Sequence, residues 1–152
     1  EVVSRYRLIG FENRAIADEQ FRSDKVKAAE IGAGHSVTAL FEIKLKPEAV
    51  GQIATVYLRW KDPDTKEVIE IKQPFASQDL AASFTQAAPR LQWDAIVAEY
   101  AEILRGSPWA KGSTLAAVLE EAQRVGPLLA DDPDVQEFVG LVRRAGTLPR
   151  RD

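Results

Sequence analysis

The spacing of apolar residues changes once along the chain, near Phe75. Before this point apolar and polar residues tend to alternate, whereas from about Asp79 the apolar residues recur every three or four positions. The first period is that of a half-buried β-strand and the second that of an amphipathic helix. The pattern predicts an α+β chain, with a β-rich part over residues 1–76 and a helical part over residues 77–152 packed on it as one module.

The alternating segments predict four strands in the first half. They are Ser4–Phe11, His35–Leu45, Ile53–Lys61 and Glu67–Lys72. The last two are separated by Asp62-Pro63-Asp64-Thr65-Lys66, whose proline and aspartates favour a turn, so they predict a β-hairpin. We therefore expect an antiparallel sheet of at least four strands that forms one layer of a small sandwich.

The alternation also predicts which side of each strand is buried. In the first strand Tyr6 and Leu8 share one face, and in the hairpin we expect Val56, Leu58 and Trp60 to be buried against the core. Their neighbours in the hairpin are expected to be Ile69 and Ile71. The charged residues of the opposite face should contact water, namely Arg59, Lys61, Glu70 and Lys72.

The second half predicts three to four helices, separated by glycine and proline. Asp79 is expected to cap a short segment that runs to Ala87, and Pro89 suits the first turn of a helix that ends at Gly106. We expect Ser113 to cap a further helix, and Asp132-Pro133 to open the last. The predicted inward stripes are Trp93, Ile96, Val97, Tyr100 and Leu104; Leu115, Val118, Leu119, Ala122 and Val125; and Val135, Phe138, Val139 and Val142.

Composition narrows the classes of partner. The chain has 152 residues, 45% of them hydrophobic and 28% charged, with a net charge of −3 and a pI near 5.3. This charge does not favour nucleic acid, and no apolar run approaches the roughly 20 residues that span a bilayer, so we expect no membrane insertion by this segment. The absence of cysteine excludes thiolate catalysis and cysteine-based metal sites. The absence of methionine suggests a processed chain or a piece of a longer one, and the polar end over residues 147–152 suggests that the missing part precedes Glu1.

Five stretches of the chain carry a resemblance to a known family. They are residues 5–14, 24–26, 30–42, 103–109 and 137–145, so the resemblance covers nearly the whole chain. The chain resembles the C-terminal domain of uncharacterised bacterial proteins and lipoproteins that carry a von Willebrand factor A (VWA) domain. It departs from that family around residues 85–92, where it is more polar and contains Pro89.

The resemblance implies a cell-envelope location, on the periplasmic or extracellular side, and no established activity for this segment. It also implies an upstream metal-dependent adhesion domain, whose metal site uses Asp-x-Ser-x-Ser and suits magnesium. That motif is absent here, so we expect no metal and no cofactor in this chain. We predict a non-catalytic structural and interaction module whose partners are the upstream VWA domain and another envelope protein. The alternative is an independent ligand-binding module for envelope glycan or peptide.

The segment Gly32-Ala33-Gly34-His35-Ser36 contains the only histidine. A phosphate loop needs a following Lys-Ser/Thr and a helix, and a catalytic triad needs a base beside an exposed nucleophile. A strand is predicted after His35, and Ser36 would face away from it. We therefore expect Gly32 and Gly34 to permit a tight loop and His35 to make a local hydrogen bond, with catalysis at His35 as the alternative.

A group of polar residues near the first strand is the second candidate site. Asp24 and Glu30 are expected to pair with its arginines and so pin the long connection over residues 12–34, which is unusual in length for a compact domain. The alternative is a recognition surface for the upstream domain. The candidate residues are Arg5, Arg7, Glu12, Asn13 and Arg14.

Two further groups complete the candidates. Asp131, Asp132 and Asp134 suggest helix capping rather than a calcium loop, because Pro133 interrupts them. Trp60 and Trp93 fall on predicted inward faces. Trp109 follows Ser107-Pro108 in a loop and is the tryptophan we expect to be exposed and available to a partner.

Overall fold

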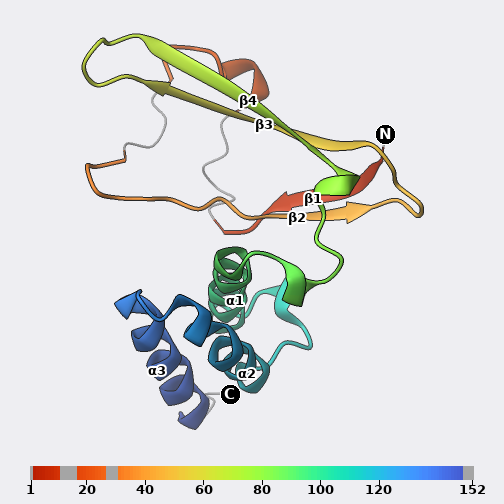
Figure 1. Cartoon of the computed structure of the whole chain (residues 1–152), viewed down its shortest axis with the longest axis vertical. Coiled ribbons are helices and arrows are strands. Elements are labelled where there is room, and N and C mark those ends of the chain that lie inside the picture. Colours follow the sequence, from red (N-terminus) through yellow and green to blue (C-terminus); the bar gives the residue numbers. More distant parts are fainter. Residues whose placement is uncertain (1, 11–16, 27–30, 149–152) are drawn as a thin grey trace. The chain divides into compact units, whose positions relative to one another are not determined.

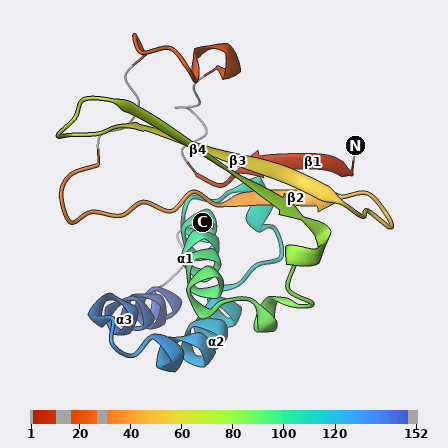
Figure 2. The ribbon, with the colours of Figure 1, turned by 45° about the horizontal axis from the view of Figure 1, so that its top comes forward.

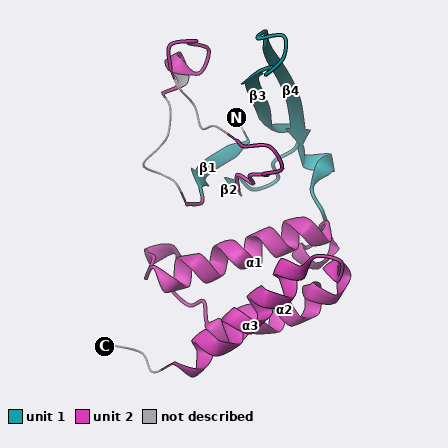
Figure 3. Ribbon diagram, turned by 90° about the vertical axis from the view of Figure 1, so that its left-hand side faces the viewer, with its two compact units in different colours: residues 1–8, 41–82 teal, residues 9–40, 83–152 magenta. Residues whose placement is uncertain are grey.

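The structure is a computed structural model of the 152-residue chain, and it describes residues 2–10, 17–26 and 31–148. Antiparallel strands in the first half and helices in the second confirm the α+β class (Figure 1). The chain divides into two compact units, residues 1–8 with 41–82 and residues 9–40 with 83–152 (Figure 3). The strands lie in the first, which we call the strand unit, and the α-helices in the second, which we call the helical unit.

The strand unit contains two separate two-stranded ladders, so the prediction of one four-stranded sheet is wrong for the described residues. Strand β1 (Val3–Leu8) pairs antiparallel with β2 (Phe41–Leu45), and β3 (Gln52–Lys61) pairs with β4 (Val68–Ala76). Figure 2 shows β3 and β4 as one long twisted hairpin. Alternation specifies the faces of a strand but not its neighbour, which explains the error.

The first ladder shows which part of the predicted second strand forms. His35–Leu45 was expected to be one strand, but only Phe41–Leu45 is β-structure, and Val37 is exposed. The ladder stops after Leu8 pairs with Phe41 and Ile9 N donates to Leu40 O, because Gly10 then turns the chain with φ 72°. The segment 35–40 has no partner strand among the described residues, so it forms no ladder although its apolar and polar residues alternate.

The hairpin prediction is confirmed at its turn. Asp62 Oδ1 accepts hydrogen bonds from the backbone N–H groups of Asp64 and Thr65 at 2.9 and 2.8 Å. Lys66 adopts φ 63° and closes the turn with a hydrogen bond from its N–H to Asp62 O. Strand β4 extends beyond the predicted end at Lys72, and Pro74 lies within it opposite Thr55, which a proline tolerates because each strand of a two-stranded ladder has an open edge.

The helical unit is built from α1 (Pro89–Leu104), α2 (Leu115–Val125) and α3 (Pro133–Thr147). No α-helix forms over Asp79–Ala87, and the chain has short 3₁₀ turns at Ser77–Asp79 and Phe84–Gln86. Asp79 accepts a hydrogen bond from Ala76 N. The cap of α2 is Thr114 and not Ser113, one residue later than predicted. Asp132 caps α3 as expected, with Oδ1 accepting from Asp134 N at 3.1 Å.

The predicted helical stripes form the core. Trp93 and Tyr100 of α1 each meet the ring of Phe138 of α3 edge to face, with centroids 5.3 Å apart. Val97 and Leu104, which were also expected to be inward, are exposed at the margin of the α1 stripe. The buried hydrophobic residues are Trp93, Ile96, Val118, Ala122, Val125, Val135 and Val142.

Every buried side chain of the described residues lies in the helical unit. None of the described residues of the strand unit, 2–8 and 41–82, is buried. The two units therefore differ in the burial of their apolar residues. The helices bury a set of theirs against one another, whereas those of the ladders are half-buried or exposed.

Candidate interaction surfaces

Arg5 and Arg7, two arginines of the second candidate site, lie on one face of the β1–β2 ladder. Arg7 is opposite Glu42 in the register, and its Nε donates to Glu42 Oε2 at 2.7 Å. Arg5 Nη2 lies 4.0 Å from Glu42 Oε1. The side chain of Arg7 is 18% exposed and that of Glu42 45%, so the pair joins the two strands at a partly hydrated surface.

Glu42 could not be named as a partner from the sequence, because cross-strand pairing depends on a register that alternation does not specify. The expected pairing of these arginines with Asp24 and Glu30 remains a prediction. Glu30 lies outside the described residues, as do Glu12, Asn13 and Arg14. The role of the group as a recognition surface remains a prediction.

The opposite face of this ladder is apolar. An irregularity in the register between Val3 and Arg5 places Val3 on the face of Tyr6 and Leu8, opposite Leu45. Tyr6 is 70% exposed on this face. The predicted separation of Arg5 and Arg7 from Tyr6 and Leu8 is confirmed, but the apolar side is not covered.

The β3–β4 hairpin has a second, longer apolar face. Val56, Leu58 and Trp60 of β3 were expected to be buried, and that prediction is wrong: their exposed fractions are 52%, 55% and 43%. The register confirms the expected neighbours, since Leu58 lies opposite Ile71 and Trp60 opposite Ile69. The pairing was therefore predictable from alternation and the turn, whereas the exposure was not.

Trp109 lies at the surface, held by a buried polar cluster at the end of α1. Ser107 Oγ donates to Glu102 Oε2 at 2.6 Å and accepts from Trp109 N at 3.3 Å. Arg105 Nη2 pairs with Glu102 Oε1 at 2.6 Å, and Glu102 is 6% exposed. Gly106 reverses the chain with φ 64°, a conformation that suits glycine after a helix.

This cluster fixes the backbone before Trp109, a residue that is 50% exposed. The family-like stretch over residues 103–109 is thus a helix end with an ordered loop. Glu102 was not singled out by sequence reasoning, because its burial depends on how the loop folds back on α1.

The loop with the single histidine has the expected local structure. His35 N donates to Gly32 O at 3.1 Å, and Gly34 has φ 79°. A side chain at position 32 would meet the His35 ring, since a Cβ there would lie 3.1 Å from Nδ1. Gly32 therefore leaves room for the His35 ring, and Gly34 supplies the positive φ of the turn.

A shallow groove lies between the start of α2 and the end of α3. It encloses about 430 Å³ and is mostly apolar, and its lining includes Leu115, Leu119, Val142 and Arg143. No aromatic residue lines it, so it lacks the stacking surface expected of a glycan site. Trp109 lies outside its lining.

Two negative findings concern the described residues only. They contain no group of three or more His, Cys, Asp or Glu side chains placed to hold a metal ion. None of the helices in that part of the chain is long and apolar enough to cross a membrane.

Comparisons with known proteins identify relatives of unknown function. Residues 1–148 match the family described as "Uncharacterized protein YfbK, C-terminal". The chain is 29% identical over 164 positions to the "Uncharacterized protein YfbK" of Escherichia coli (strain K12). The aligned region covers 94% of this chain and 27% of the E. coli protein. The chain thus spans about a quarter of the length of this relative. No solved structure matches it significantly.

Proposed function

The chain belongs to the YfbK C-terminal domain family, and on this premise we propose that it is a non-catalytic structural and interaction module. Its partner is a metal-dependent VWA domain in the same polypeptide, at the cell envelope. The resemblance described above supports the VWA link and the location. The length of the E. coli relative supports a larger polypeptide, since the matched part is 27% of it.

One observation carries the proposal: none of the described residues of the strand unit is buried. Two-stranded ladders are at best marginally stable in water unless their apolar face is covered. A unit with two such ladders and exposed apolar residues on each therefore needs a partner surface. An interaction role explains why the two ladders expose apolar residues. The helical unit is stabilised by its own buried core.

The test is to produce the upstream region and this 152-residue chain separately and to measure their association by calorimetry, with and without magnesium. We expect the two to bind, and we expect the upstream region alone to bind magnesium through an Asp-x-Ser-x-Ser motif. Absence of binding at high concentration would overturn the proposal. So would magnesium binding by this chain, which would instead favour an independent binding domain.

A second candidate, a ligand-binding module for envelope glycan or peptide, is favoured by the ordered, half-exposed Trp109. Binding of peptidoglycan fragments that is lost in Trp109→Ala but kept in Trp60→Ala would support it. Unchanged tryptophan fluorescence during such a titration would count against it.

A further inference from the structure

One face of the β3–β4 hairpin has the character of a contact surface. Residues opposite one another in an antiparallel ladder lie on the same face. Val56, Leu58 and Trp60 therefore share a face with Ile69 and Ile71. This apolar hairpin face consists of these five residues, and Leu58, Trp60 and Ile71 are 55%, 43% and 49% exposed.

The other face of the hairpin carries its charged residues. Arg59 lies opposite Glu70, and Tyr57 opposite Lys72. Tyr57, Val68 and Pro74 are the apolar members of this face. An amphipathic hairpin of this kind is typical of a ladder with one side covered and one side in water, and the covered side must be the apolar hairpin face.

We propose that the apolar hairpin face docks, within the same polypeptide, on an apolar surface of the domain that precedes this module. The inference rests on the proposed function and names its contact surface. The apolar hairpin face is a different surface from the polar group around Arg5 and Arg7, which the sequence suggested as the contact.

Chain length argues for this occupant. The matched region is 27% of the E. coli relative, so most of that protein lies outside it, and the family is described by its C-terminal position. A surface on the same polypeptide is present at a high effective concentration. It can therefore cover the apolar hairpin face even if its intrinsic affinity for that face is low. The strand unit offers no core of its own to bury the face.

The test uses the full-length protein with a photo-crosslinking amino acid, p-benzoylphenylalanine, in place of Leu58. The matched control replaces Lys61, which lies in the same strand on the opposite face. Crosslinked peptides are mapped by mass spectrometry, and a mixture of isotopically light and heavy protein identifies crosslinks between copies. We expect position 58, in excess over position 61, to crosslink within one copy to residues that precede the module.

Three outcomes would overturn the inference. They are crosslinks from position 58 to residues 83–148, which would mean that the module covers its own hairpin; crosslinks between copies; and equal crosslinking at positions 58 and 61. None of these outcomes contradicts the proposed function if the upstream region and the 152-residue chain bind one another when produced separately.

Association of the separate parts gives an independent measurement. Burial of a leucine side chain is worth enough that Leu58→Ser should weaken binding about tenfold to a hundredfold. Lys61→Ser, which introduces the same residue on the charged face, should change it by less than about threefold. If wild-type parts fail to bind, the proposed function fails; if they bind and Leu58→Ser binds as tightly, only the docking surface is wrong.

Discussion

At the scale of single residues, backbone hydrogen bonds to Asp62 define the hairpin turn. The N–H groups of Thr65 and Asp64 donate to its carboxylate and hold its pKa below the usual 3.8. The ionised form is therefore favoured in the folded hairpin more than in the unfolded chain.

We predict that the hairpin loses stability in acid. Because the folded-state pKa is lowered, the stabilisation is fully present above the unfolded-state pKa and is lost as pH falls through the folded-state pKa. Asp62→Asn should flatten this dependence, and Asp64→Asn in the same turn should retain it. Amide exchange of Thr65 measured between about pH 2 and 6 checks the prediction; identical profiles in wild type and Asp62→Asn would contradict it.

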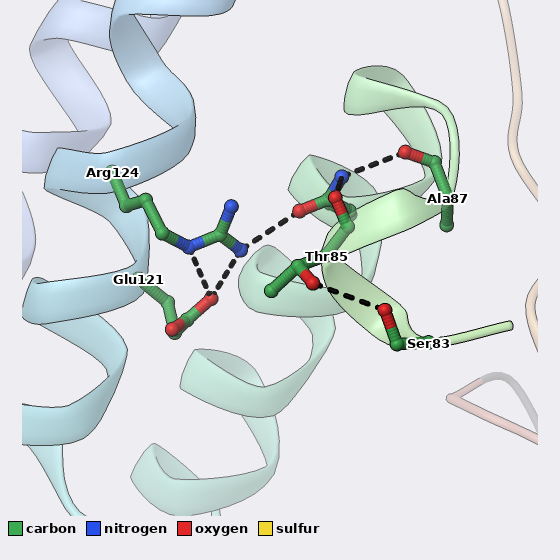
Figure 4. A network of polar contacts seen from close by, with 6 residues as sticks. Ser83, Thr85, Ala87, Glu121 and Arg124 are labelled. Atoms are coloured by element: carbon green, nitrogen blue, oxygen red, sulfur yellow. Dashed lines mark hydrogen bonds and ion pairs between the residues drawn. The ribbon is translucent and has the colours of Figure 1, made fainter.

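At the scale of elements, a polar network includes Thr85 and Ala87 before α1 and Glu121 and Arg124 of α2 (Figure 4), and one buried glutamine of α1 joins them. Gln92 is 2% exposed; its Nε2 donates to Ala87 O at 2.7 Å and to Thr85 O at 3.3 Å. Its Oε1 accepts from Arg124 Nη2 at 2.8 Å, and Arg124 also pairs with Glu121. The absence of an α-helix over Asp79–Ala87 is compatible with this arrangement, since carbonyls of that segment bond to the glutamine.

We expect Gln92→Leu to lower the free energy of unfolding of the helical unit by about 1–3 kcal/mol, because two part-buried hydrogen bonds to carbonyls and the bond from Arg124 are lost. Gln123→Leu, an exposed site on α2, should change it by less than about 0.5 kcal/mol. Urea denaturation followed by far-ultraviolet circular dichroism measures both. Equal stability of Gln92→Leu and wild type would show that the network contributes nothing net.

At the scale of the whole molecule, the two units differ in the source of their stability. The helical unit has a closed core around Trp93 and Val125, whereas no described residue of the strand unit is buried. Regions with few buried apolar contacts open at low free energy.

Hydrogen exchange should reveal this difference in the 152-residue chain. We predict that backbone amides of α1 and α2 exchange at least about tenfold more slowly than those of β3 and β4, relative to their intrinsic rates. Addition of the upstream region should slow exchange in β3 and β4 and leave the helices unchanged. Strands as protected as the helices in the isolated chain would contradict the prediction.

The sequence by itself determined features set by neighbours along the chain. Alternation and the turn at Asp62 specify the β3–β4 hairpin and its two faces, and Asp132-Pro133 specifies the start of α3. Local stereochemistry and side-chain period suffice for these, because the interacting groups lie a few residues apart.

Only the tertiary structure decided features that depend on distant residues. The pairing of Arg7 with Glu42, the division of four strands into two ladders and the burial of Glu102 each need groups brought together by folding. The exposure of Leu58 also depends on distant residues. The alternation indicates that burial of its face is favourable, but whether the face is buried depends on a covering surface that alternation does not specify.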